Sequence, residues 1–320
     1  MPKFDTQTPQ RVIATDYNFI RDKVVSVLST GSGQRGYGQP LQSSSVLTGN
    51  NITKAQWDKL KDDLISIKQH QDGELPLIVE LGTGQVIRYG AGHPNTNYDT
   101  LADQCILEKF NIGPGQFVLA NKASDTHTTA WTTQAQATLT VTFAGGYTVT
   151  NADSSSWVAS SSDNARHFFN SGGKIRFSSA RTGGANTPQN NAWTNLLTTV
   201  GPIDFGAIEP VITNFYSLTN SYTTFYQRSL TTPYSANYYR LEALCNCTDP
   251  TNVNGTADTI TFRITWQDTY VSGPSASPAD GVDGTLSITV DELKAAGTLS
   301  PTGSFSILSP SYSAINISAT

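Results

Sequence analysis

The spacing of apolar residues changes along this chain, and that change constrains the fold more than any other feature. Before about residue 74, apolar residues recur every three or four positions, as on one face of a helix. After it they alternate with polar residues, as in half-buried strands at 139–143, 260–266 and 286–290. The sequence predicts a mainly β fold with an N-terminal helical hairpin (α+β) and an antiparallel β-sandwich-like body.

The two expected helices differ in how clearly they are marked. In the first, Thr15 is the expected cap and the pattern stops at Gly31. In the second, Thr53 and Gln56 form a capping box, and the helix should end near Gly73. Its apolar stripe is a candidate interface with the body, a sister subunit or another protein, and consists of Trp57, Leu60, Leu64 and Ile67.

Glycine-rich segments predict loops and turns. Residues 29–50 should join the two helices, and the string at 31–38 lacks the Gly-Lys-Ser/Thr ending of a phosphate loop, so we expect a packing or docking loop. Asn254-Gly255 has the composition of a two-residue hairpin turn. A short helix, with Trp193, Leu196, Leu197 and Val200 on one face, is expected to plug the β body.

The charge balance argues against nucleic acid as the main partner. Charged residues make up 14% of the chain, and the net charge is −5 with a pI near 5.3. Phosphate binding relies on clustered Lys and Arg, and no basic run occurs. Ser, Thr, Asn, Gln and Gly fill the polar positions instead. Such a surface suits a homo-oligomer, an assembly protein or a carbohydrate binder.

The chain shows no sign of export or membrane insertion. Its N-terminus lacks the pattern of a signal peptide, and no apolar run approaches the roughly 18 residues of a membrane helix. We therefore expect a protein made in the cytoplasm. Three cysteines cannot all pair, so Cys105, Cys245 and Cys247 are expected to be buried free thiols.

No motif for catalysis is visible, and we assign no catalytic, cofactor or metal residues. The four histidines, including His93 and His127, are widely separated and lack a metal-binding or nucleophile pattern. His167 is expected at a polar edge above an apolar pair. Asp268, Asp280 and Asp283 fall in or beside expected loops. We expect a turn at 280–284; oxygen ligands for calcium are the alternative interpretation.

Residues 214–239 are unusually rich in aromatic side chains. Tyrosine combines apolar area with a hydroxyl, and it is frequent at interfaces and in sugar sites. An edge strand and hairpin packed on the core is an equally good interpretation. The candidate interface residues of this segment are Tyr216, Tyr222, Phe225 and Tyr226.

Three strings resemble segments of virion structural proteins, of the tail, neck or fibre type, from contractile-tailed, T4-like phages that infect cyanobacteria. They are VVSVLSTGSGQRGYGQPLQSSSV with ITKAQWDKLKDDLISIKQHQDG in 17–73, ARHFFNSGGKIRFSSARTGG with QNNAWTNLL in 165–197, and ITFRITWQD with DGVDGTLSITVDELKAAG. Together they cover about half of the chain. The resemblance implies a place in a virion and other virion proteins as partners, and it supplies no catalytic residues.

The expected organisation is a helical attachment or oligomerisation module at 1–73, a connecting or inserted β region at 74–135 and the β body at 136–320. The expected function is a non-enzymatic component of the phage tail, neck or collar, or baseplate and fibre apparatus. Two alternatives stay open: a tail-fibre body that binds host surface polysaccharide, and an envelope depolymerase.

Overall fold

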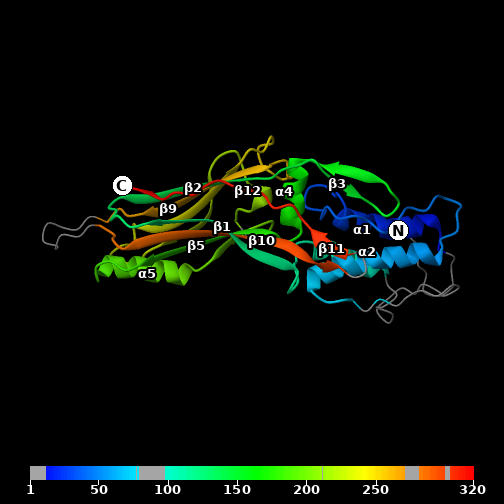
Figure 1. Cartoon of the computed structure of the whole chain (residues 1–320), viewed down its shortest axis with the longest axis horizontal. Coiled ribbons are helices and arrows are strands. Elements are labelled where there is room, and N and C mark those ends of the chain that lie inside the picture. The colour runs from blue at the N-terminus through cyan, green and yellow to red at the C-terminus, as the bar shows by residue number, and fades with distance from the viewer. Residues whose placement is uncertain (1–11, 77, 79–97, 211, 271–280, 300–302) are drawn as a thin grey trace. The chain divides into compact units, whose positions relative to one another are not determined.

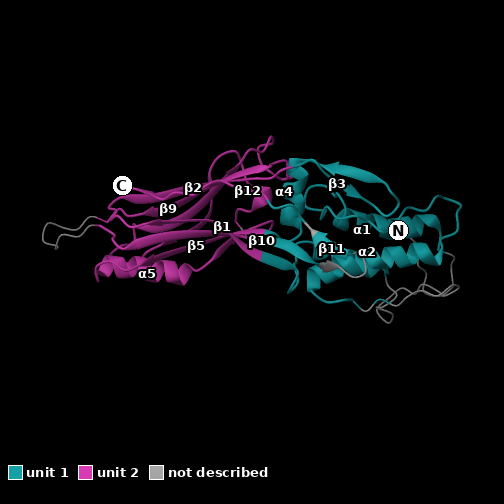
Figure 2. Ribbon diagram, viewed as in Figure 1, with its two compact units in different colours: residues 1–118, 145–173, 294–309 teal, residues 119–144, 174–293, 310–320 magenta. Residues whose placement is uncertain are grey.

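The structure is a computed structural model that describes residues 12–76, 78, 98–210, 212–270, 281–299 and 303–320. Helices and mostly antiparallel sheets make up this part of the chain (Figure 1). The chain forms two compact units (Figure 2): unit 1 holds 1–118, 145–173 and 294–309, and unit 2 holds 119–144, 174–293 and 310–320. The expected boundaries at 73 and 135 do not coincide with these units, because each unit is assembled from three separate segments.

The two helices expected near the N-terminus are present in unit 1. Helix α1 (Ala14–Leu28) begins one residue before Thr15, so the prediction of Thr15 as its cap is wrong; Asp16 instead accepts a hydrogen bond from the Ile13 N–H. Helix α2 (Lys54–Asp72) has the predicted capping box. Thr53 Oγ1 accepts from the Gln56 N–H at 3.3 Å, and Gln56 Oε1 accepts from the Thr53 N–H at 2.8 Å.

Unit 1 also contains elements that the periodicity did not reveal. Helix α3 (Tyr98–Leu107) packs against both α1 and α2. Strands β3 (Tyr147–Thr150) and β4 (Ser156–Ala159) pair with each other, and helix α4 (Ser161–Asn170) follows. Strand β11 (Gly303–Ser306) pairs with the end of β10 (Thr285–Leu299). The expected connecting region 74–135 is thus divided among α3, β1 and the start of β2, apart from residues outside the described ranges.

Unit 2 is built on two sheets. One follows the order β1 (Phe117–His127), β10, β5 (Lys174–Thr182) and β6 (Ile203–Phe205). The other is six-stranded and runs β12 (Ser311–Tyr312), β2 (Gln134–Thr142), β9 (Thr259–Gln267), β8 (Tyr238–Cys245) and β7 (Thr223–Ser229), with β13 (Ser318–Ala319) also paired to β2. Because each strand is pleated, successive side chains lie on opposite faces of its sheet.

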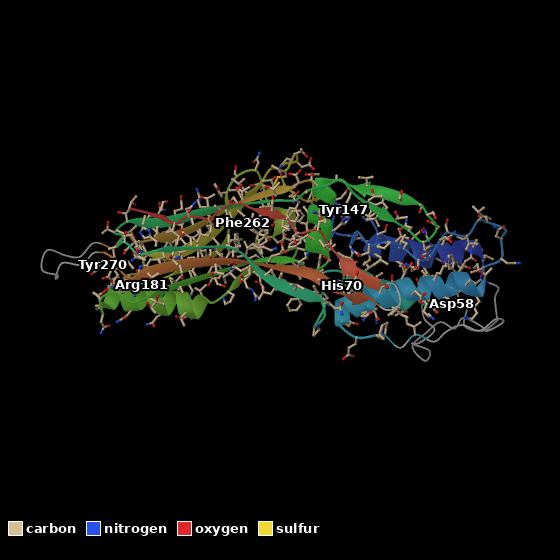
Figure 3. All side chains as sticks on the ribbon, in the orientation of Figure 1. Asp58, His70, Tyr147, Arg181, Phe262 and Tyr270 are labelled. Carbon is tan, nitrogen blue, oxygen red and sulfur yellow. A yellow bond between two sulfur atoms is a disulfide. The ribbon has the colours of Figure 1, made fainter. Side chains whose placement is uncertain are left out.

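The side chains of β5, β6, β7 and β9 meet in one aromatic core. The ring of Phe262 on β9 lies 5.0 Å from that of Phe177 on β5 and 5.1 Å from that of Phe205 on β6, measured between centroids; Phe262 is labelled in Figure 3. The predicted buried faces are confirmed: each residue of the sets is buried, namely Leu139, Val141, Phe143, Ile260, Phe262, Ile264, Trp266, Leu286, Ile288 and Val290.

Helix α5 (Pro188–Val200) confirms the short helix predicted around Trp193. Thr187 caps it, and Trp193 is fully buried, with its ring 5.2 Å from that of Trp131. The helix lies along β5 (Figure 1), and Arg181 of β5 donates to the Asn190 carbonyl at 3.2 Å. A 3-10 turn, η2 (Phe215–Ser217), precedes β7.

Two sequence predictions for the β8–β9 connection are wrong. Asn254-Gly255 is a turn inside the long loop between Cys245 and Thr259, not a two-residue hairpin, because buried Asn252 holds that loop through the Phe215 carbonyl and the Ala257 N–H. Cys245 and Cys247 form a disulfide instead of staying free. Cys105 is a buried free thiol, as predicted.

None of the described helices has the length and apolar character that a membrane crossing requires.

Replacing Phe262 with alanine tests the aromatic core. Phe262→Ala should lower the free energy of unfolding by about 3–5 kcal/mol, because the neighbouring rings cannot move far enough to fill the cavity that it leaves. Thr261→Ala, one residue away on the opposite face, should change it by less than about 0.5 kcal/mol. Urea denaturation followed by tryptophan fluorescence measures both values. Equal effects for the two variants would contradict the assigned core.

Candidate functional site: buried contacts and the outer face of the six-stranded sheet

The apolar stripe of α2 is covered by its own chain. The Trp57 ring lies between Tyr17 of α1 and Tyr98 of α3, with centroids 5.2 Å apart in both pairs. The four residues of the stripe are all buried: Trp57, Leu60, Leu64 and Ile67. In this structure the stripe is therefore satisfied within unit 1 and is not open to a second protein.

The four aromatic candidates of the 214–239 segment separate into two groups. Tyr216 and Phe225 are buried in unit 2, and Phe225 belongs to the aromatic core. Tyr222 and Tyr226 are half-buried. The Tyr222 ring lies 4.0 Å from the guanidinium carbon of Arg263. Tyr222 thus packs against a charged group.

The 29–50 loop is held by polar side chains from α1 and α2. The buried carboxylate of Asp63 accepts hydrogen bonds from the backbone N–H groups of Gln42 and Ser43, at 2.8 and 2.9 Å. Burial raises the pKa of Asp63 to about 6. Asn18 pairs with the backbone of Val46 in both directions. The expected packing role of this loop is supported by these contacts.

Helix α4 holds the glycine-rich part of the same loop, residues 30–38. The Arg166 guanidinium, which also pairs with Asp163, donates to the carbonyls of Thr30 and Arg35 at 3.3 and 3.1 Å. Asn170 donates to the carbonyls of Gly33 and Gly36. Unpaired buried carbonyls would each cost free energy, so α4 replaces the hydrogen bonds that a helix or a strand would have supplied.

His167 completes this contact and corrects the expectation of a polar edge. The residue lies on α4 and is fully buried; its Nε2 donates to the Thr30 carbonyl at 3.0 Å, and its Nδ1 accepts from the Tyr147 hydroxyl at 2.9 Å. Burial lowers the pKa of His167 to about 4, which keeps the ring neutral. The ring also sits where a side chain at Gly38 would begin, because an added Cβ would lie 2.5 Å from Nδ1.

A second set of polar contacts closes one end of unit 2. The Asp283 carboxylate accepts from the Ala185 N–H at 3.1 Å and from the side chains of Asn190 and Arg181. These donors hold the pKa of Asp283 below its usual range. The residue therefore joins the start of β10 to the segment between β5 and α5. Residues 281–284 of the turn expected at 280–284 are consistent with this role; Asp280 lies outside the described residues.

The outward-facing residues of the six-stranded sheet form rows of neutral polar side chains. Gln134 of β2 donates to Gln267 of β9 at 3.2 Å, and Gln136 donates to the Thr265 hydroxyl at 3.4 Å. Thr140 and Thr261 continue the pattern in the next row. The pairing of β2 with β9 and of β9 with β8 extends these rows across three strands. We call this surface the outer face.

One charged cluster lies in the middle of the outer face. The buried carboxylate of Glu242 on β8 accepts a hydrogen bond from Arg263 Nε at 2.8 Å, and Arg240 Nε lies 3.3 Å from the same oxygen. Each guanidinium also covers a tyrosine ring: Arg263 that of Tyr222, and Arg240 that of Tyr238 at 4.9 Å. The carboxylate and the two rings fix both arginines in place.

The remaining described acidic and histidine candidates do not form a site together. Asp268 is buried and accepts hydrogen bonds from Gln189, from Asn237 and from the Tyr270 N–H. His127 is half-buried, and His93 lies outside the described residues. Within the described ranges no three His, Cys, Asp or Glu residues are grouped so that they could hold a metal ion.

Sequence reasoning missed Arg166, Asn170, Arg240, Glu242 and Arg263. A signal for the first two was present, because Ser160 and Asp163 form a capping box ahead of the helical stripe of Ala165, Phe168 and Phe169. No local signal could bring Glu242 and Arg263 together, since they meet only through the pairing of β8 with β9.

Comparison with known proteins gives no match. No family model, no curated protein and no solved structure is similar to this chain.

Alanine at Gly38 tests the contact between α4 and the loop. Gly38 and Gly49 both have positive φ, +69° and +91°, but a Cβ at Gly49 meets nothing within 4 Å. Gly49→Ala should cost about 1–2 kcal/mol from backbone strain alone. Gly38→Ala should cost about 1–3 kcal/mol more, because the buried His167 ring must also shift. The denaturant midpoints of the two variants measure the difference. An equal loss of stability in Gly38→Ala and Gly49→Ala would contradict the contact between Gly38 and His167.

Buried His70 makes stability depend on pH. Its Nε2 donates to the Ser171 carbonyl, its ring stacks on Phe305, and burial lowers its pKa to about 4. The unfolded state takes up the proton near pH 6.5, so stability should fall between pH 6.5 and pH 4 by up to about 3 kcal/mol. Asp63, whose pKa is raised, acts in the opposite direction. Its contribution to the free energy of unfolding is lost as the pH rises through about 6.

The difference between wild type and His70→Gln isolates the histidine, since Asp63 is common to both proteins. Free energies of unfolding at several pH values from 7.5 to 4 measure it. We expect the wild type to lose stability relative to the variant as the pH falls. Parallel curves would show that His70 does not titrate as described.

Proposed function

We propose that this chain is a non-enzymatic structural component of a tailed bacteriophage particle, of the tail, neck or collar, or baseplate and fibre type. In this proposal it is assembled in the host cytoplasm and acts through contacts with copies of itself and with other virion proteins. The N-terminal helices, in a hairpin-like arrangement, provide an attachment module, and the sheets of unit 2 provide a β-sandwich-like body.

The observation that supports this proposal most is where the resembling strings lie. Arg166 and Asn170 in the second string bind the glycine loop in the first string. Asp283 in the third string binds Asn190 in the second, and also Ala185, which lies between the two parts of the second string. Residues of these strings therefore hold the framework of each unit together, which is what a resemblance in overall fold would require. A resemblance confined to surface segments would carry much less weight.

Strand β1 offers an edge for subunit contact. Among the described strands it pairs only with β10, so its other edge has no partner strand in the sheet. Its first residues, Phe117, Val118 and Leu119, are consecutive and 42–51% exposed. Unprotected edge strands with apolar residues tend to pair with another chain. The α2 stripe is buried, so attachment through unit 1 must use other residues of its surface.

The proposal predicts that the chain is present in purified phage particles in a fixed number of copies, and that β1 contributes to its incorporation. Leu119→Lys should reduce the copy number severalfold, because a charge at the edge opposes strand pairing. Val158→Lys is the matched control, since Val158 is also an exposed apolar strand residue, on β4. Quantitative mass spectrometry relative to the major head protein measures both.

Two outcomes would count against the proposal in different ways. Absence of the wild-type chain from purified particles would rule out a virion role. Normal incorporation of Leu119→Lys would leave the virion role but exclude β1 as the contact.

A further inference from the structure

The outer face of the six-stranded sheet presents two arginine side chains with unused donors. Within the described residues, the polar partner of both guanidinium groups is one carboxylate oxygen of Glu242: Arg263 Nε donates a hydrogen bond to it at 2.8 Å, and Arg240 Nε forms an ion pair with it at 3.3 Å without a hydrogen bond. The side chains of Arg240 and Arg263 are 27% and 30% exposed. Their terminal Nη groups are thus left to bind something outside the chain.

The cluster carries an excess of positive charge. Two guanidinium groups share one carboxylate, so one positive charge remains on the outer face of an otherwise acidic protein. The other outward-facing residues of β2, β8 and β9 are uncharged, as the strand registers show. Charge complementarity therefore favours a ligand with anionic groups, and the planar guanidinium fork matches a carboxylate.

The surroundings of the cluster favour a polyhydroxylated ligand. The flanking rows are amides and hydroxyls, and their half-buried members Gln134, Gln136 and Thr140 can donate to and accept from sugar hydroxyls. The tyrosines beside the arginines, Tyr222 and Tyr238, add ring surface. A protein interface would need an apolar centre, and nucleic acid would need many more basic groups.

We infer that the outer face binds an anionic polysaccharide, whose uronate carboxylates accept hydrogen bonds from Arg240 and Arg263. Glu242 is a positioning residue in this site, since it aims both guanidinium groups without meeting the sugar itself. The site belongs wholly to unit 2 and uses a face of the sheet instead of the β1 edge. Its existence is independent of the proposed virion role.

Binding of the full-length protein to polygalacturonate, measured by isothermal titration calorimetry, tests the inference. We expect saturable binding that weakens as salt is raised, and no binding to neutral dextran. Arg240→Gln and Arg263→Gln should each weaken binding about tenfold or more, because each removes charge-assisted hydrogen bonds. Arg240→Lys should weaken it less than Arg240→Gln, since the charge remains.

Arg228→Gln is the matched control. Arg228 is exposed on β7, and its position opposite Tyr239 puts it on the other face of the sheet. The affinity of the Arg228→Gln variant for polygalacturonate should stay within about twofold of that of the wild-type protein. As a second measurement on unaltered protein, the side-chain Nε resonances of Arg240 and Arg263 should shift on adding polygalacturonate, which covers the case of a variant that fails to fold.

Several results would overturn the inference. They are the absence of polygalacturonate binding by the wild-type protein, an equal loss of affinity in Arg228→Gln, and binding of DNA as tight as that of polygalacturonate. If the wild-type protein binds polygalacturonate but the Nε resonances of Arg240 and Arg263 do not shift, the ligand lies outside the outer face and the inference is wrong.

Discussion

The hydrogen bonds between α4 and residues 30–38 are the contact on which the structure of unit 1 depends. A glycine-rich loop without regular structure carries carbonyls that must be paired if they are buried. Arg166, His167 and Asn170 supply the donors from more than 130 residues further along the chain. Because the three side chains come from successive turns of one short helix, the loop is fixed as a unit and the helices on either side of it are fixed with it.

Unit 2 uses the same principle at one end of its sheets. Apolar burial provides most of the stabilisation, with the rings around Phe262 at its centre. Apolar contacts are not directional, so they tolerate shifts of one strand or helix against another. The carboxylate of Asp283 removes that freedom, since it can satisfy Ala185 and Asn190 in only one arrangement.

How much of this could be predicted from sequence depends on the range of the interactions. Helix α2 was predictable to the residue, because the Thr53 capping box and Gly73 are local signals. The buried faces of β2, β9 and β10 followed from alternation. Helix α4 was missed although its capping box was visible, and Asn254-Gly255 was misread because buried Asn252 overrides the local turn preference. The division into units was beyond prediction, since the chain passes from one unit to the other five times.

This division bears on how the protein can work. Neither unit is a continuous segment, so removing residues 1–72 would take α1 and α2 out of unit 1 while leaving α4 without its loop. The candidate interface residues of the sequence were apolar and aromatic, and six of the eight are buried. What the described surface offers instead is a strand edge and a polar sheet face. Both are surfaces that other molecules can contact.

Hydrogen exchange at the loop amides tests the central claim most directly. The N–H groups of Tyr37, Gly38 and Gln39 donate to the carbonyls of Val27, Ser29 and Leu28, at the end of α1 and just beyond it. If α4 fixes the loop, these three amides should exchange as slowly as those of α1, and Asn170→Ala should speed them up while the centre of α2 stays protected. Fast exchange at the three amides in the wild-type protein, beside slowly exchanging helices, would contradict the account.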